Sequence, residues 1–321
     1  FERQSIINTP PNTILGPGIT NQFTASPTIN DIRGYLYGNF TLPSQVAWTL
    51  GLSYQDYEED LIDFDRFNPK VGMQWDVTDS LRARGAWFKV VKPALASNQT
   101  LEPTQVAGFN QYFDDTNATR SERFGGAIDW QAKHDLYLGA EASRRELETP
   151  IFSSSRTVVN FRDWDEWTHR AYAYWTPADR WSLSAEAVYD EFKGDVLTFT
   201  DIQTGSITLH SARTLSYPLR AQYFHPNGFI AGLGITYVDQ KVDRTATGNP
   251  RSTDNSYFAV GDISIGYRLP KRMGILSLSV QNVTDEEFDF LDDSYREFQD
   301  EPSTGPYIPD RSIMARITFN L

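Results

Sequence analysis

Cysteine is absent from this sequence and histidine is scarce, which limits the chemistry that the chain can perform. Without cysteine no disulfide framework forms, and this is compatible with export to an oxidising compartment. The histidines are His134, His169, His210 and His225, and they show neither metal-ligand spacing nor a serine or aspartate partner motif. The acidic stretch Asp285 to Asp293 lacks the alternating ligands and glycine of a calcium loop, so a solvated loop is favoured. We therefore predict no catalytic site, no metal and no cofactor.

Basic residues are also fewer than acidic ones. The chain has 29 Lys and Arg against 42 Asp and Glu, a net charge of −13, which argues against a nucleic-acid partner. It also lacks any run of about 18 apolar residues, so no transmembrane helix is encoded. A membrane location is still open, because the strands of a transmembrane barrel alternate apolar and polar side chains and keep the mean hydropathy low.

The end of the chain has the pattern of a two-faced β-strand, with side chains alternating between its faces. One face carries Ile313, Ala315, Ile317, Phe319 and Leu321, and the other carries Met314, Arg316, Thr318 and Asn320. An outer-membrane barrel pairs its last strand with its first, because lipid cannot satisfy an open sheet edge. We expect this strand to close a barrel; the alternative is an edge strand of a soluble sandwich.

The same alternation recurs along the chain in stretches of about ten residues, joined alternately by short turns and long loops. The predicted strands are residues 32–40, 46–55, 67–75, 81–89, 120–131, 136–145, 167–175, 181–192, 208–224, 229–241, 257–267, 275–282 and 312–321. A barrel with both termini on one side needs an even number of strands, and Glu2 to Thr9 is the stretch left for the missing partner. We therefore predict about fourteen strands, within a range of about 12 to 16.

The short turns lie on the side where the chain ends, which predicts that they are periplasmic and that the long loops are extracellular. The predicted long loops lie near residues 10–29, 58–65, 93–119, 147–163, 194–206, 242–255 and 284–311. Aromatic side chains close to the short turns are expected to form a girdle at the membrane interface. They are Trp75, Trp130, Trp175, Trp181 and Tyr267.

The polar face of the strands carries many charges, which in a lipid barrel would line a wet lumen. The candidate lumen residues are Arg33, Arg82, Arg84, Arg123, Asp129, Glu141, Arg145, Arg170, Glu186, Asp190, Arg220, Asp262, Arg268 and Arg316. Two roles stay open for them: cross-strand ion pairs that hold the wall together, or guidance of a solute. The long loop 93–119 is expected to fold inward and narrow the lumen with Phe109, Tyr112 and Phe113.

Several segments resemble known outer-membrane proteins. Val280-Gln281-Asn282-Val283-Thr284-Asp285-Glu286-Glu287-Phe288, followed by Pro309-Asp310-Arg311-Ser312 and the terminal strand, resembles the C-terminal end of TonB-dependent outer-membrane receptors. Phe67-Asn68-Pro69-Lys70-Val71-Gly72 and Leu101-Glu102-Pro103-Thr104-Gln105-Val106-Ala107-Gly108-Phe109-Asn110-Gln111 are similar to receptor-like barrels associated with tetratricopeptide-repeat outer-membrane proteins. The resemblance implies an outer-membrane barrel of transport type. Such receptors have about 22 strands, more than this chain can form.

Together these observations predict an all-β fold: a single antiparallel transmembrane β-barrel over residues 1–321 in a bacterial outer membrane. We expect it to be part of a longer polypeptide, with a periplasmic repeat domain upstream. The predicted function is a channel that translocates a solute or polymer, in contact with outer-membrane lipid. Two alternatives are kept: a non-conducting anchor whose acidic extracellular loops bind a surface partner, and an uptake barrel like the TonB-dependent receptors. An outer-membrane hydrolase is less favoured.

Overall fold

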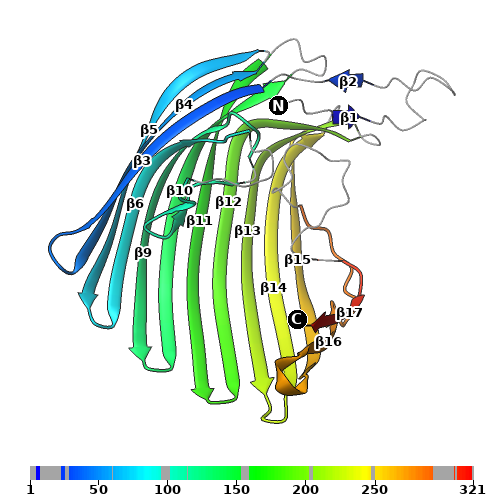
Figure 1. The fold of residues 1–321 in the computed structure, drawn as a ribbon. Helices are drawn as coiled ribbons and strands as arrows, with labels where there is room; N and C mark the ends of the chain where they lie inside the picture. The colour runs from blue at the N-terminus through cyan, green and yellow to red at the C-terminus, as the bar shows by residue number, and fades with distance from the viewer. Residues whose placement is uncertain are drawn as a thin grey trace.

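Most of the chain forms one curved antiparallel sheet (Figure 1). The computed structural model describes residues 5–7, 23–25, 29–59, 61–94, 102–113, 115–152, 159–201, 205–246, 250–291, 307 and 309–319. The thirteen strands of the sheet are, in spatial order, β3 (Ile29–Thr41), β4 (Val46–Glu59), β5 (Ile62–Thr78), β6 (Leu81–Val91), β9 (Arg120–Lys133), β10 (Leu136–Phe152), β11 (Val159–Ala178), β12 (Trp181–Asp201), β13 (Gly205–Phe224), β14 (Phe229–Ala246), β15 (Ser252–Arg268), β16 (Gly274–Gln281) and β17 (Ser312–Phe319). The all-β class and these thirteen strands confirm the prediction.

The short elements lie outside this sheet. A 3₁₀ turn, η1 (Pro270–Arg272), joins β15 to β16, and β7 (Gln105–Val106) pairs with β8 (Phe109–Asn110). The predicted fourteenth strand is not part of the described wall. β1 (Ser5–Ile7) pairs instead with β2 (Phe23–Ala25) in a separate sheet, and the rest of the segment Glu2 to Thr9 lies outside the described residues.

The edges of the sheet are β3 and β17. Within the described part of the chain, β3 pairs only with β4 and β17 only with β16, at opposite ends of the strand order (Figure 1). The terminal strand forms as predicted, with Phe319 opposite Gly274 beside the last short turn. The predicted seam between the last strand and the first is not among the described pairings.

The predicted alternation of short and long connections is only partly found, because the strands are longer and several loops shorter than the sequence suggested; β12 runs to Asp201 and β13 starts at Gly205, so the predicted long loop 194–206 is wrong. The turns predicted to be short all lie at one end of the sheet (Figure 1). At the other end β4 runs to Glu59 and β5 starts at Ile62, so the predicted long loop 58–65 is wrong. β11, β12 and β13 have 20, 21 and 20 residues. Hydrophobic alternation stops where lipid stops, whereas backbone pairing continues beyond it, and this explains the difference.

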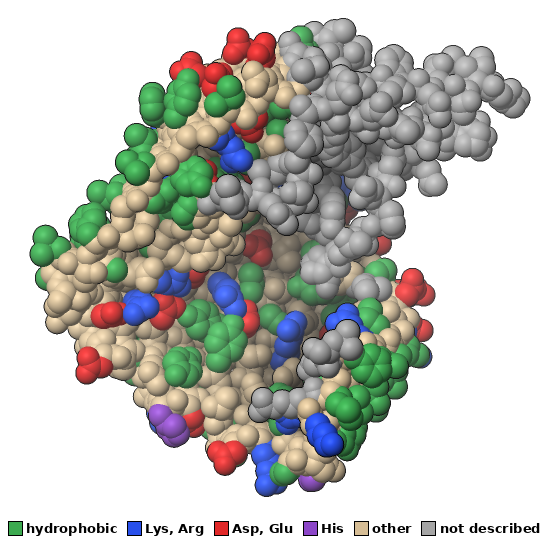
Figure 2. Space-filling model, in the orientation of Figure 1, with side chains coloured by type: hydrophobic (Ala, Val, Ile, Leu, Met, Phe, Trp, Pro, Cys, Tyr) green, Lys and Arg blue, Asp and Glu red, His purple; other side chains and the backbone are tan. Residues whose placement is uncertain are grey.

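The two faces of the wall have the chemistry that the alternation predicts. On β14, Leu233, Ile235 and Tyr237 are exposed by 53%, 48% and 43%, whereas Val238 is completely buried on the opposite face. Apolar side chains that are exposed along a whole sheet face would be unstable in water and are stable against lipid. The outer face therefore meets the membrane, and the polar face lines the hollow seen in Figure 2.

Aromatic side chains mark both borders of the lipid-facing band. The predicted girdle residues near the short turns are exposed by 38–46%; they are Trp75, Trp130, Trp175, Trp181 and Tyr267. A second row, which we call the upper aromatic row, includes Trp87, Phe124, Trp167, Tyr189, Tyr217 and Tyr237. Trp181 and Tyr189 of β12 are eight residues apart, close to the 9–11 residues, roughly, that a tilted strand needs to cross a bilayer. The remainder of this 21-residue strand extends beyond the lipid.

In the described part of the chain, no helix is long and apolar enough to cross a membrane.

Candidate functional site on the inner face of the wall

The most elaborate part of the inner face is a segment of the loop between β6 and β9. We call residues 102–113 the inner hairpin, because they contain β7 and β8 and lie against the polar face of the wall (Figure 1). Ala107 and Gly108 form its turn, with φ angles of 48° and 88°. A left-handed conformation is easiest for glycine, which accounts for Gly108 at this tip.

Apolar packing fixes the inner hairpin to the wall. Val106 and Phe109, both essentially buried, form one cluster with Phe88, Val90 and Ala127 of β6 and β9. Two strand glycines make room for this contact. A Cβ atom at Gly72 would lie 2.7 Å from Val106 Cγ1, and one at Gly125 would overlap the ring of Phe109. Both glycines therefore permit a close approach that any larger residue would prevent.

A buried polar network forms the second attachment. Lys70 Nζ of β5 lies 3.6 Å from Glu102 Oε1, with the two side chains only 1% and 4% exposed. Lys70 also donates to the Lys89 carbonyl at 3.0 Å, and the Tyr37 hydroxyl donates to Glu102 at 2.6 Å. The Tyr112 hydroxyl donates to the other oxygen of Glu102, and burial together with this carboxylate raises the pKa of Tyr112. Such a network is stable only while each partner is present.

Arginines of β6, β9 and β10 hold the tip and the far strand of the hairpin. Arg84 Nε donates to Asp129 at 2.6 Å and another of its nitrogens to the Ala107 carbonyl at 3.4 Å. Arg123 donates to the Asn110 carbonyl at 2.9 Å. Arg145 stacks on Phe113 at 3.7 Å from the ring centre. These guanidinium groups thus join wall and hairpin through charge-assisted hydrogen bonds and cation–π contacts.

A ladder of tyrosines and ion pairs continues along the inner face beyond the hairpin. The rings of Tyr172 and Tyr174 of β11 stack with centres 5.0 Å apart. The Tyr174 hydroxyl donates to Glu186 at 2.9 Å, and Arg170 Nε donates to the same carboxylate at 2.8 Å. Tyr172 donates to Asp129, which links the ladder to Arg84. This surface offers hydroxyl, guanidinium and carboxylate groups to a solute in the hollow.

The predicted lumen residues are only partly brought together. Those in contact are Arg84 with Asp129 and Glu141, Arg123 beside Arg145, and Arg170 with Glu186. Others have separate partners: Arg82 binds Asp76 near a short turn, Arg33 lies 3.9 Å from Asp31, Asp190 accepts from Thr168, and Asp262 accepts from the Asn282 amide. Arg220, Arg268 and Arg316 are exposed and form no ion pair with described residues. Their role toward a solute stays a prediction, as does the narrowing of a lumen by Phe109, Tyr112 and Phe113.

Sequence reasoning missed the residues that attach the hairpin most firmly, Lys70 and Glu102. Both occur in segments already singled out, Phe67 to Gly72 and Leu101 to Gln111, and the structure packs these two segments against each other. The sequence did contain one indication of this contact, namely the glycines Gly72 and Gly125 inside predicted strands. Glycine within a strand indicates that another segment of the chain packs closely against the strand backbone.

Comparison with known proteins identifies the family. The family model described as TonB dependent receptor-like, beta-barrel, matches residues 2–283. The chain belongs to the TonB-dependent receptor-like β-barrel family. Members of this family are barrels of the bacterial outer membrane, which agrees with the lipid-facing band described above. No curated protein matches the sequence significantly.

Solved structures agree on the fold of this TonB-dependent receptor-like barrel. The ferric-catecholate import receptor Fiu of Escherichia coli K12 has 14% identity and a TM-score of 0.55, over 85% of this chain and 43% of that receptor. The siderophore receptor PiuA of Acinetobacter baumannii has 11% identity and a TM-score of 0.51, over 79% and 48%. The FrpB iron transporter of Neisseria meningitidis has 14% identity and a TM-score of 0.59, over 82% and 42%. The chain thus spans less than half the length of these structures.

The C-terminal motif of the resemblance has a clear structural role in this barrel. Asn282, with φ of 48° and 2% exposure, donates to the carbonyls of Glu286 and Pro309 at 2.8 Å and 3.1 Å. Its side-chain oxygen accepts from the Glu286 amide at 2.9 Å. Asp285 accepts from the Arg311 amide at 2.9 Å. The two halves of the motif are thereby tied together between β16 and β17.

The segment after Asn282 also lies on the inner face. Phe288 stacks on Phe258 of β15, with ring centres 3.8 Å apart, and Phe290 packs edge-on against the same ring. Gln240 of β14 exchanges two hydrogen bonds with the backbone of Leu291, at 2.9 Å and 2.8 Å. Two connections, the inner hairpin and residues 282–291, therefore cover separate parts of the inner face.

Proposed function

We propose that this chain forms the wall of an outer-membrane uptake barrel. The barrel transports an anionic, aromatic metal chelate of the siderophore type. The supporting observation is the inner face itself, where the tyrosine and arginine ladder of β11 lies beside the firmly attached inner hairpin. The structural neighbours named as a ferric-catecholate import receptor, a siderophore receptor and an iron transporter favour the same class of solute.

The chemistry of the ladder suits such a solute. The tyrosine rings of Tyr172 and Tyr174 present flat faces on which an aromatic chelating group stacks. Arg170 and the exposed Arg220 supply cations near them, since both act electrostatically on Glu186. A metal chelate with anionic oxygens would bind guanidinium groups through charge-assisted hydrogen bonds. We propose that the energy for transport comes from a periplasmic TonB partner, as the family implies.

The test is accumulation of a radiolabelled ferric chelate by iron-limited cells that carry the full natural polypeptide. We expect uptake that stops when TonB is deleted, and about tenfold weaker chelate binding for Arg220→Gln, the loss of roughly 1.4 kcal/mol. Arg180→Gln is the matched control, because Arg180 is exposed in the short turn between β11 and β12 and is not one of the candidate lumen residues. Unchanged uptake in the absence of TonB contradicts energised transport.

Passive conduction is the second candidate function. The observation that favours it is the position of the inner hairpin, which is packed along the wall by apolar contacts to β6 and β9. A hairpin held against a wall narrows a pore without sealing it. Steady ion conductance of the purified protein in a planar bilayer, independent of TonB, would favour this function over energised uptake.

A further inference from the structure

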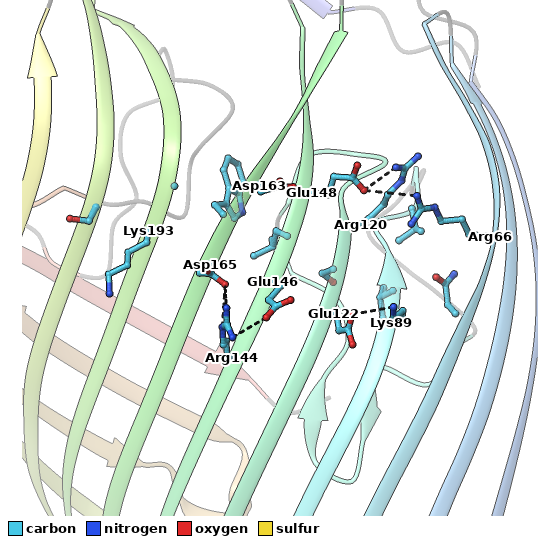
Figure 3. Close-up of a pocket in the computed structure, with 18 of the residues that line it drawn as sticks. Arg66, Lys89, Arg120, Glu122, Arg144, Glu146, Glu148, Asp163, Asp165 and Lys193 are labelled. Carbon is cyan, nitrogen blue, oxygen red and sulfur yellow. Dashed lines mark hydrogen bonds and ion pairs between the residues drawn. The ribbon is translucent and has the colours of Figure 1, made fainter.

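The outer face of the wall carries a groove that none of the inner-face chemistry uses. It has a volume of about 780 Å³ and extends from residues 66–68 of β5 across β6, β9, β10, β11 and Lys193 of β12 to Ser211 of β13 and Arg251 (Figure 3). We call it the outer groove. Six Lys or Arg side chains and five carboxylates line it. This slight excess of positive charge contrasts with the chain as a whole, where 42 acidic residues exceed 29 basic ones.

The outer groove begins at the level where the lipid-facing band ends. Arg144 lies over the ring of Trp167, 5.0 Å from its centre, and Trp87 donates to Glu122 at 2.7 Å. Both tryptophans belong to the upper aromatic row. Tryptophan and tyrosine concentrate where hydrocarbon gives way to lipid headgroups, because their rings are apolar and their tips polar. The groove is therefore at the height of the outer-leaflet headgroups.

The groove forms because neighbouring strands differ in length. β6 and β9 end together at the pair Val91 and Arg120, whereas β5 and β10 continue beyond that level, and this leaves a notch in the outer face. Arg120 closes the notch from above. Its guanidinium lies between the rings of Phe64 and Phe161, 4.6 Å and 4.7 Å from their centres. β5 and β11 thus meet around this arginine, although three strands separate them in the sheet.

The charges within the groove are separated. At one end Arg120 and Arg66 approach the same Glu148 carboxylate at 2.9 Å and 4.0 Å, so two cations share one anion (Figure 3). In the middle of the groove Arg144 pairs with both Glu146 and Asp165, at 2.9 Å and 2.7 Å, so two anions share one cation (Figure 3). The end at Arg66 and Arg120 suits a phosphate group, and the middle suits hydroxyl groups, which donate to carboxylates.

We propose that the outer groove binds the phosphorylated sugar headgroup of an outer-leaflet glycolipid. Its phosphate lies at Arg66 and Arg120, and its sugar hydroxyls lie at Glu146 and Asp165. At headgroup height on the outer face a lipid headgroup reaches the groove directly, whereas a solute in the lumen lies on the opposite face of β9, β10 and β11. The proposal rests on the outer-membrane location of the barrel and is independent of the proposed uptake function.

The experiment measures binding of diphosphorylated lipid A, and of lipid A from which both phosphates have been removed, to the full-length protein in detergent. We expect at least tenfold tighter binding of the phosphorylated form, weakened by salt. Arg66→Gln should reduce affinity about tenfold, because its side chain is 46% exposed and contributes little to folding. Arg82→Gln, at the opposite border of the membrane band and 49% exposed, should bind like the unmodified protein.

Three results would overturn the proposal. One is equal binding of lipid A with and without phosphate. Another is the same affinity for Arg66→Gln and Arg82→Gln. The third is equally tight binding of phosphatidylglycerol, which has phosphate but no sugar ring and would show a general anionic-lipid surface. A loss of iron-chelate uptake leaves all three measurements unaffected, so failures of the two proposals are distinguishable.

Discussion

Lys70 and Glu102 form an ion pair, 3.6 Å long and almost completely buried, that joins the barrel wall to the inner hairpin. Charges of this kind are stable only as a pair, because each alone would be left uncompensated away from water. The Tyr37 and Tyr112 hydroxyls donate to the two oxygens of the same carboxylate. The position of the inner hairpin is thus determined by a small number of groups, and single substitutions test it.

Replacing Lys70 with Met should release the inner hairpin. The substitution leaves Glu102 buried without its cation, at a cost of about 3–5 kcal/mol. Hydrogen exchange of the amides in residues 102–113 should increase strongly, while exchange in β13 to β15 stays unchanged. Met has nearly the volume of Lys, so a cavity does not explain the effect. Unaltered protection of the hairpin would show that apolar packing alone positions it.

Gly125→Ala should displace the hairpin by a steric route. A Cβ atom at Gly125 overlaps the Phe109 ring, whereas one at the neighbouring Gly126 meets nothing within 4 Å. Overpacking of this kind costs about 1–3 kcal/mol. Limited proteolysis between residues 102 and 113 should become faster in Gly125→Ala and remain slow in Gly126→Ala. Equal rates for the two variants would contradict the packing of Phe109 against β9.

Removal of residues 104–115 should enlarge ion conductance in a planar bilayer. The deletion takes away Phe109, Tyr112 and Phe113, which lie on the inner face. A wider polar passage conducts more ions, and the acidic loops should favour cations. Intact and shortened proteins with identical conductance would mean that another part of the protein limits the pore. Silence of both, with a surface partner still bound to the loops, would favour the anchor function.

Much of the wall was predictable because one physical rule governs it. Leu50 and Leu52 alternate with Gly51 and Ser53 in the sequence, and the structure exposes the two leucines by 44% and 45% while burying Ser53. Lipid on one side and polar groups on the other impose this period of two over each membrane crossing. The thirteen strands from Ile32 to the end of the chain and the short turns at one end of the sheet followed directly.

The strand ends, the contacts of the inner hairpin and the outer groove depend on interactions that the two-residue alternation of side chains does not encode. Above the lipid, apolar packing changes to the inner face, where Trp164 of β11 contacts Phe192 of β12, while Asp165 pairs with Arg144 on the outer face. The pattern of apolar residues on the outer face therefore ends there, although the backbone ladder continues. The ion pair of Lys70 and Glu102 joins positions 32 residues apart, and neither residue differs locally from a solvent-exposed one. The outer groove arises where β6 and β9 end before β5 and β10, which only the relative lengths of neighbouring strands reveal.

The Asn282 network offers a test of the family motif. Asn282→Ala removes side-chain hydrogen bonds to Glu286 and Pro309, each worth about 0.5–1.5 kcal/mol. It also places a residue with a Cβ but no side-chain amide at a φ of 48°, which asparagine tolerates better than alanine.

Asn282→Gly separates these two effects, because glycine accepts the positive φ but makes no side-chain hydrogen bond. We expect both variants to loosen residues 282–291, with Asn282→Ala the less stable by about 1 kcal/mol, measured as unfolding free energy in lipid bilayers.

Orientation of the wall is tested by arginine on either face. Leu50 of β4 is 44% exposed on the lipid-facing side, whereas Thr49 binds Asn39 on the polar side at 2.8 Å. Leu50→Arg should cost about 2–4 kcal/mol at mid-bilayer, because lipid cannot solvate the guanidinium. Thr49→Arg should cost far less, since water in the hollow solvates it. The measurement is the folding free energy of each variant in bilayers of equal thickness, with Ile317→Arg and Thr318→Arg as a second pair on β17. Equal costs on both faces would reject the assignment of the apolar face to lipid and, with it, the headgroup height of the outer groove.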